Sequence, residues 1–263
     1  MILSLYLVFF VQVSSYVSSP LSPKVIMDNV HLRKGGQILL QGFDVTFEAG
    51  QWTCLVGPNG CGKTTLLRLL AGLETAQRGQ IISVPNRESV ASQVCYMAQQ
   101  DLLLPWLSIL DNVLLGLRLR RHCPTTEQVA RAKNLLTDVG LANYIQSRPA
   151  LLSGGMRQRA ALIRTLMEER SIVLMDEPFS AVDALTRLYL QNLAVRMLAK
   201  RTVIFVTHDP LEALCLGHTI FVLSGLPTTI RNRFQPSDIP PRSPTSPECI
   251  ELHTSLLHSL SVL

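Results

Sequence analysis

A glycine-rich loop between residues 57 and 64 carries the clearest chemical signal in this sequence. Its glycines can turn successive backbone N–H groups inward to form a nest for an anion such as a phosphate. Lys63 can reach the β- and γ-phosphates of a nucleotide, and the Thr64 hydroxyl can bind Mg²⁺. The loop fits the pattern GxxxxGK[ST] and, with the residue after it, reads Gly57-Pro58-Asn59-Gly60-Cys61-Gly62-Lys63-Thr64-Thr65.

The segments on either side of this loop support a nucleotide site. Trp52–Val56 is an apolar run typical of a buried parallel strand. Thr64–Ala71 is Leu-rich and predicts a helix whose positive end faces the phosphates. A glycine turn with a chance lysine is the alternative, but the strand–loop–helix order argues against it. Kinases, GTPases and other ATPases all remain compatible with such a loop.

Two carboxylates that follow a later apolar strand narrow the class of nucleotide-binding protein. Ile172–Met175 predicts a buried strand, and Asp176 and Glu177 come directly after it. At a strand end beside the phosphate loop, Asp176 can hold Mg²⁺ directly or through water. Glu177 points a different way and can polarise an attacking water as a general base. The alternative is a pair of ordinary surface acids after a buried strand.

Composition sets wide limits on the class of protein. The chain has 263 residues, a net charge of +5 and 47% apolar residues, so it can bury a large core and is not expected to be disordered throughout. The six cysteines show neither a CxxC pair nor metal-ligand spacing, which favours reduced thiols. The moderate charge suits polyphosphate, nucleic acid or an anionic membrane surface and does not choose among them.

Predicted strands alternate with predicted helices, which indicates an α/β fold with a mainly parallel sheet. Leu107–Leu152 looks helical, with a capping box at Thr125 and Gln128, and an α-helical insertion is expected at about residues 102–165. A helix is also predicted at Gly155–Glu169. The predicted strands are Val25–Val30, Phe43–Phe47, Trp52–Val56, Ile81–Val84, Gln93–Met97, Ile172–Met175 and Thr202–Val206.

A serine–glycine segment before the acidic strand points to a family. Leu152–Arg159 reads Leu-Ser-Gly-Gly-Met-Arg-Gln-Arg and resembles the signature of ABC transporter ATP-binding subunits. The resemblance covers about residues 25–224 and implies the P-loop ABC ATPase fold, with antiparallel strands at its N-terminal side. Ser153 and the glycines open a helix, so the segment offers a hydroxyl, N–H groups and a positive dipole end.

The resemblance implies that ATP is bound between two copies of the chain. In the family, the signature surface meets the γ-phosphate of ATP held by the other copy, so a head-to-tail homodimer completes two sites. Asp183, in a loop resembling the one that communicates across the dimer, is expected at the same place. The residues expected to face the partner's ATP are therefore Ser153, Gly154, Gly155, Gln158 and Asp183.

Two further positions match residues that the family places around the γ-phosphate. Gln99 resembles the glutamine that meets Mg²⁺ and the attacking water, although the neighbouring Gln100 is an alternative register. His208 resembles the switch histidine that holds the γ-phosphate, Glu177 and water in geometry. The sequence departs from the family pattern at two positions. Lys34 stands where an adenine-stacking aromatic is common, and Cys61 replaces a small hydroxyl residue or glycine in the loop.

The ends of the chain are expected to lie outside the ATPase domain, which we place at residues 25–225. Residues 1–24 form an apolar extension, explained by a misassigned start at Met27, a dispensable extension or a membrane-touching segment. Residues 226–263 predict a loose proline-rich tail with a short helix at Glu248–Leu260.

The resemblance also implies partners and a location. Leu103-Leu104-Pro105-Trp106 forms an apolar knuckle that can receive a permease subunit; core packing is the alternative. It resembles importers of the nitrate, sulfonate and taurine group. Gly50–Cys54 and Leu166–Glu169 look closest to importers of a thiamine precursor, hydroxymethylpyrimidine. Such a subunit sits peripherally on the cytoplasmic face of the membrane.

A substrate-binding protein on the periplasmic or extracellular side would then be an indirect partner. The second hypothesis is a regulatory ABC-type ATPase that acts on nucleic acid or a ribosome. No long basic run appears, and the helical insertion is short for a coiled coil. We therefore expect no nucleic-acid partner.

Overall fold

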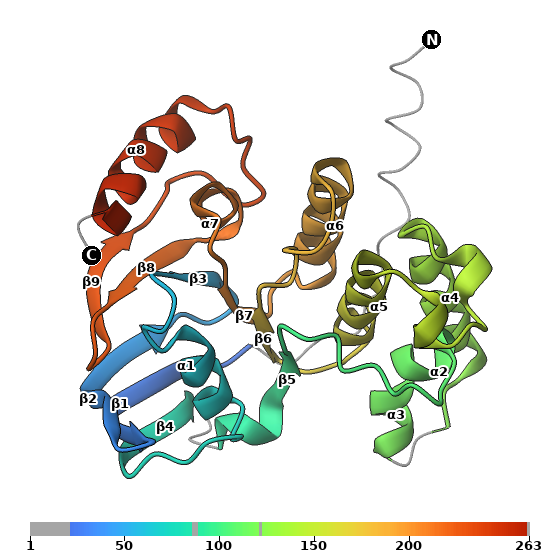
Figure 1. The fold of residues 1–263 in the computed structure, drawn as a ribbon, viewed down its shortest axis with the longest axis horizontal. Coiled ribbons are helices and arrows are strands. Elements are labelled where there is room, and N and C mark those ends of the chain that lie inside the picture. The colour runs from blue at the N-terminus through green and yellow to red at the C-terminus, as the bar shows by residue number, and fades with distance from the viewer. Residues whose placement is uncertain (1–21, 86–88, 121–122, 262–263) are drawn as a thin grey trace.

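The computed structural model describes residues 22–85, 89–120 and 123–261, which form two sheets and the helices that cover them (Figure 1). The N-terminal apolar extension lies outside the described residues up to position 21. The strands are β1 (Lys24–Lys34), β2 (Gln37–Phe47), β3 (Trp52–Val56), β4 (Arg78–Val84), β5 (Val94–Met97), β6 (Ile172–Asp176), β7 (Thr202–Val206), β8 (Thr219–Ser224) and β9 (Thr229–Phe234).

The larger sheet has the order β5-β6-β7-β3-β8-β9, and all its strands run parallel except β9 at one edge. Strands β3, β6 and β7 are buried at every position, as expected for apolar runs covered on both faces. The smaller sheet has the antiparallel order β2-β1-β4. The predicted α/β fold with N-terminal antiparallel strands is therefore confirmed.

The helices divide between the sheet faces and a helical insertion. Helix α1 lies by the small sheet, whereas α2 to α4 gather on the opposite side of the molecule (Figure 1). The predicted capping box is present at the start of α4, where Thr125 and Gln128 each accept a backbone N–H from the other. The helices are α1 (Lys63–Leu70), α2 (Ile109–Val113), α3 (Leu115–Leu119), α4 (Thr126–Asp138), α5 (Gly154–Leu166), α6 (Ala184–Met197), α7 (Pro210–Leu216) and α8 (Pro247–Ser261).

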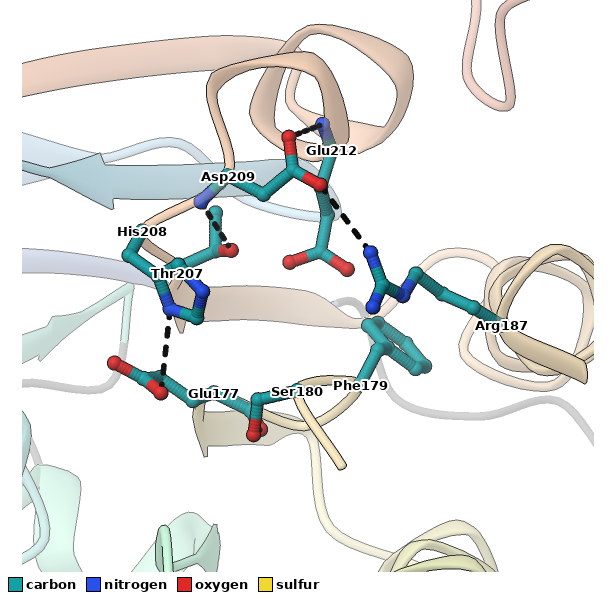
Figure 2. Close-up of a pocket in the computed structure, with 8 residues that line it drawn as sticks. All are labelled: Glu177, Phe179, Ser180, Arg187, Thr207, His208, Asp209 and Glu212. Carbon is teal, nitrogen blue, oxygen red and sulfur yellow. Dashed lines mark hydrogen bonds and ion pairs between the residues drawn. The ribbon is translucent and has the colours of Figure 1, made fainter. Parts of the chain in front are cut away.

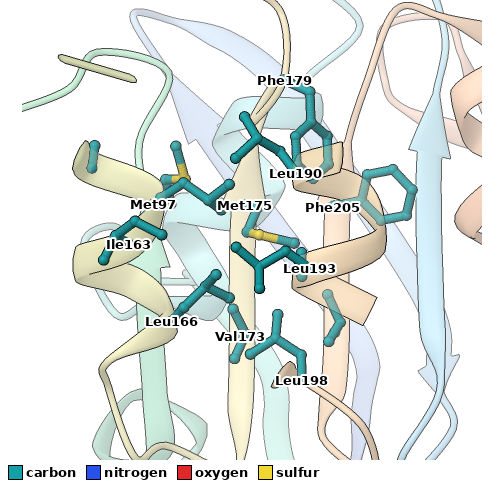
Figure 3. Packing of buried hydrophobic residues seen from close by; sticks show 14 of the residues in the cluster. Met97, Ile163, Leu166, Val173, Met175, Phe179, Leu190, Leu193, Leu198 and Phe205 are labelled. Carbon is teal, nitrogen blue, oxygen red and sulfur yellow. The ribbon is translucent and has the colours of Figure 1, made fainter. Parts of the chain in front are cut away.

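One core packs the parallel sheet against α5 and α6. Figure 3 shows apolar side chains of both helices packed against those of β6. Trp52 of β3 stacks edge-on against Phe205 of β7, with ring centroids 5.7 Å apart. Burial of such large apolar surfaces is the main force that holds the sheet in place. A second cluster joins α1 to the small sheet.

The segment after residue 225 is more ordered than the sequence predicts. Strand β9 pairs with β8, and α8 packs on α7. The guanidinium of Arg242 donates hydrogen bonds to the backbone oxygens of Leu214 and Gly217, at 2.7 and 2.8 Å, and so caps the end of α7. The expectation of a loose tail beginning at residue 226 is therefore corrected. Strand β9 was not predicted because it lies in a proline-rich segment and has no apolar run.

No helix within the described ranges 22–85, 89–120 and 123–261 combines the length and apolar character that a membrane crossing requires.

Two adjacent leucines of α8 test whether this helix is part of the fold. Leu256 is fully buried, whereas Leu257 is 46% exposed. We expect Leu256→Ala to lower the free energy of unfolding by about 2–5 kcal/mol, because the substitution leaves a cavity. Leu257→Ala is the matched control and should change it by less than about 0.5 kcal/mol. Equal effects of the two substitutions in urea unfolding would contradict the packing of α8 on α7.

Candidate nucleotide-binding site

The parallel register brings three chain segments to one edge of the sheet. Leu55 of β3 pairs with Val206 of β7, and Val206 pairs with Asp176 of β6. The segments that follow these strands therefore leave the sheet at the same level. They are the glycine-rich loop, the acidic pair and the turn that contains His208, and all were predicted to act together.

The glycine-rich loop is closely packed against its own strand. A Cβ atom at Gly57 would lie 2.4 Å from the backbone oxygen of Leu223, so no larger residue fits there. The Lys63 ammonium folds over the loop and donates hydrogen bonds to the backbone oxygens of Gly57 and Pro58, both at 2.8 Å. Helix α1 begins at Lys63, so its N–H groups face the loop.

A cleft of about 710 Å³ lies over this loop, within the usual size of ligand sites. It brings together predicted residues from the loop, from the segment after β5, from the acidic pair and from the turn after β7. Leu39 of β2 and Val206 complete the wall, and the sequence had not singled out either. The residues that line it are Leu39, Asn59, Gly60, Gly62, Lys63, Thr64, Thr65, Gln99, Glu177, Val206 and His208.

Asp176 lies beneath the cleft with an unsatisfied oxygen. Its side chain is buried, and among the described residues its Oδ2 atom has no hydrogen-bond partner. Burial raises the pKa of this carboxyl, contact with the Thr64 hydroxyl opposes the rise, and the Glu177 charge adds to it. A buried oxygen without a partner, beside a hydroxyl oxygen, fits a hard cation such as Mg²⁺.

Glu177 is held at the edge of the cleft in a strained conformation. Its φ is 50°, in the left-handed region, where a residue with a side chain is uncommon. Its backbone N–H donates to the oxygen of Val206 at 3.0 Å, which ties it to β7. Its Oε2 atom lies 3.3 Å from Nδ1 of His208 (Figure 2). The same atom accepts from Nε2 of Gln99 at 3.4 Å.

The structure thus brings Gln99, Glu177 and His208 into direct contact across three different segments. Gln100 is not among the residues that line the cleft, so the geometry favours the Gln99 register.

The predicted partner-facing residues divide into two groups. Ser153 and Asp183 are exposed and cap helices, Ser153 accepting from the N–H of Met156 at 3.3 Å and Asp183 from that of Thr186 at 3.0 Å. Gly154 is exposed beside Ser153. None of these is among the described residues lining the cleft of its own chain. Gly155 instead packs closely, since a Cβ atom there would lie 2.7 Å from the oxygen of Ala181.

Gln158 lies elsewhere than the sequence predicts. Its side chain is only 5% exposed. Its Nε2 atom donates to the backbone oxygen of Glu177 at 2.9 Å, and its Oε1 atom accepts from the N–H of Ala181 at 2.8 Å. These bonds use the amide inside the chain, so we correct the expectation that Gln158 reaches a second copy: it braces the loop after β6. The position of Gln158 in the helix that follows Ser153 does not reveal these bonds, because the loop that Gln158 contacts is distant in sequence.

A small polar cavity of about 20 Å³ lies behind the Glu177–His208 contact (Figure 2). Arg187 of α6 joins its two sides, with Nη1 lying 3.4 Å from Oδ2 of Asp209 and Nη2 donating to the oxygen of Val182 at 3.3 Å. Burial raises the pKa of Glu212, whose Oε1 atom accepts from Gln191 at 2.8 Å. Sequence reasoning missed this network. Asp209 before a proline is a helix-start signal that could have located one end of it.

The structure shows the surroundings of Lys34 and Cys61, the two positions that depart from the family pattern. Lys34 pairs with Glu74 at 2.6 Å and does not line the cleft among the described residues. Leu39, on the neighbouring strand, presents an apolar side chain there instead. Cys61 is buried, and burial raises the pKa of its thiol, so it adds no negative charge beside the loop's N–H groups.

Comparisons with known proteins show the family of this chain. The ABC transporter family matches residues 40–180. An uncharacterized ABC transporter ATP-binding protein of Haemophilus influenzae is 44% identical over 203 residues, which cover 76% of this chain and 81% of the relative. The aliphatic sulfonates import ATP-binding protein SsuB 1 of Paracoccus denitrificans is 38% identical over 245 residues, covering 92% of this chain and 96% of the relative.

The fold is similar to a solved structure as well. A dimeric post-hydrolysis state of the ATP-binding cassette MJ0796, bound to ADP and Pi, has a TM-score of 0.70 and 25% identity, and the match covers 80% of this chain and 98% of that one. With the glycine-rich loop, the acidic pair and the histidine at one edge of the sheet, these likenesses identify the chain as a nucleotide-hydrolysing, ATP-binding subunit of the ABC transporter family.

Proposed function

We propose that this chain energises an importer by binding Mg-ATP in the cleft and hydrolysing it within a head-to-tail homodimer. The observation that carries the proposal is the convergence of the glycine-rich loop, Asp176, Glu177 and His208 at the carboxyl ends of three neighbouring strands. Active sites of open α/β sheets form at such edges.

Each polar group in the cleft has a role that its position supports. The loop's N–H groups and Lys63 hold the phosphates, since Lys63 need only exchange two backbone oxygens for phosphate oxygens. Thr64 and Asp176 hold Mg²⁺, with Gln99 nearby. The metal supplies charge neutralisation for the β- and γ-phosphates. Glu177 accepts the proton of the attacking water, while His208 orients Glu177 and the γ-phosphate.

A second copy completes the site in this proposal. Ser153, Gly154 and Asp183 are exposed and do not line their own cleft. The Ser153 hydroxyl accepts one N–H within its own chain and can still donate to ATP on a partner. The similar MJ0796 structure is dimeric, which supports this arrangement.

The exposed end of the apolar knuckle, at Pro105 and Trp106, supports docking on a permease, whereas Leu103 packs in the core. Trp106 is 67% exposed, although the backbone beside it is fixed. The side chain of Asn112 is fully buried. Its Oδ1 atom accepts from the backbone N–H of Leu104 at 2.7 Å, and its Nδ2 atom donates to the backbone oxygen of Leu104 at 3.1 Å. A rigid loop that presents a large aromatic side chain is suited to bind a partner. We place the chain on the cytoplasmic face of the membrane, with an external substrate-binding protein as an indirect partner.

The proposal also concerns the molecule that the importer carries. The segments that resemble thiamine-precursor importers favour hydroxymethylpyrimidine, whereas the Paracoccus denitrificans relative is named for aliphatic sulfonates. Trp52, within the first segment, is buried in the core and does not itself contact a cargo. In this proposal other subunits of the importer select the cargo.

Glu177→Gln tests the assigned general base. We expect hydrolysis to fall by about 10²–10⁴-fold, because the amide cannot accept the water's proton, while ATP affinity stays unchanged. The exposed Glu251→Gln serves as the control and should match the unaltered chain. Phosphate release together with equilibrium ATP binding measures both effects. Full hydrolysis by Glu177→Gln would overturn the assignment.

Co-purification from native membranes separates import from regulation. An importer subunit should retain a multi-span membrane protein, and the captured substrate-binding protein should carry either hydroxymethylpyrimidine or a sulfonate, identified by mass spectrometry. A regulatory ATPase should retain RNA or DNA instead. Substituting Trp106 with Ser should release the membrane partner without lowering basal ATP hydrolysis. Recovery of nucleic acid with no membrane protein would contradict the import proposal.

A further inference from the structure

Thr228 connects two walls of the cleft from a position outside the predicted ATPase domain. It lies between β8 and β9, and its side chain is only 3% exposed. Its hydroxyl donates a hydrogen bond to the backbone oxygen of Cys61 at 2.7 Å, and its N–H donates to the oxygen of Leu39 at 2.8 Å. One residue therefore holds both the phosphate loop and the strand that lines the opposite wall.

The bond to Cys61 fixes the direction of the next N–H group. In a trans peptide the C=O of one residue and the N–H of the next lie in one plane and point in opposite directions. The Cys61–Gly62 bond is not among the cis peptides of the described chain. Because Thr228 holds the Cys61 oxygen toward the protein, the Gly62 N–H is directed to the other side. Gly62 lines the cleft, so this N–H belongs to the nest that an anion would meet.

The fit between Gly62 and the Thr228 hydroxyl leaves no spare room. A Cβ atom at Gly62 would lie 2.7 Å from Oγ1 of Thr228, and φ at Gly62 is 97°. Glycine is thus required there for the close approach of the hydroxyl as well as for the backbone conformation. The Cys61 oxygen is buried, so removing the hydroxyl would leave it without this donor.

We propose that Thr228 is a positioning residue for the phosphate loop: its hydroxyl orients the Cys61–Gly62 peptide and so sets the affinity for the β- and γ-phosphates of the nucleotide. This inference rests on the proposed binding of ATP in the cleft. It assigns a nucleotide-affinity role to a residue that does not itself line the cleft.

Thr228→Val and Thr228→Ser form a matched pair, since valine keeps the shape without the hydroxyl and serine keeps the hydroxyl. We expect Thr228→Val to weaken ATP and ADP binding about tenfold, or about 1.4 kcal/mol. Binding of AMP, which lacks these phosphates, should stay unchanged. Thr228→Ser should bind ATP within about twofold of the unaltered chain. The exposed neighbour Thr229→Val is the control and should have no effect.

Calorimetric titration of the full chain at fixed Mg²⁺ measures these affinities, and thermal unfolding of each nucleotide-free variant checks its fold. If Thr228→Val does not fold, Thr228→Ala against Thr228→Ser gives the same comparison. Equal ATP affinity of the valine and unaltered chains would overturn the inference, as would equal losses for valine and serine. An unaltered chain that binds no ATP would instead overturn the proposed function.

Discussion

Parallel pairing of β3, β7 and β6 is the constraint on which the whole site depends. Because Val206 pairs with both Leu55 and Asp176, loops from three distant parts of the chain begin at one level. Side chains alternate between the faces of a strand, so a one-residue slip of β6 would turn Asp176 to the other face and move Glu177 away from His208. Such a slip is disfavoured because all three strands are buried at every position, so each shifted side chain would have to be repacked in the core.

The site gathers features that cost stability, and the surrounding packing offsets them. Asp176 carries a buried oxygen without a partner in the described chain, Glu177 has a left-handed backbone, and burial raises the pKa of Glu212. Their supports come from outside the glycine-rich loop. Gln158 braces the Glu177 loop, Arg187 links the loop after β6 to the His208 turn, and Thr228 holds the phosphate loop. Substitutions in these supports are expected to alter function before they alter the fold.

Local patterns predicted the strand–loop–helix unit around Lys63 and the capping box of α4, because each depends on neighbours in sequence. The resemblance to the family predicted that Gln99 and His208 belong to the site, and in the structure both side chains contact Glu177. Features that depend on distant contacts were missed. Strand β9 has few apolar residues and is recognisable only through its pairing with β8. The buried roles of Gln158 and Thr228 depend on loops far away in sequence, and the pairing of Lys34 with Glu74 depends on a contact across forty positions.

The central claim is that each site combines the loop of one copy with the Ser153 surface of another. Mixing inactive Lys63→Ala chains with inactive Ser153→Arg chains tests it most directly. Half of the random dimers are mixed, and each mixed dimer holds one intact composite site of two. ATP hydrolysis should therefore return to about a quarter of the unaltered rate. A mixture that stays inactive, or a Ser153→Arg chain that hydrolyses ATP normally alone, would contradict the claim.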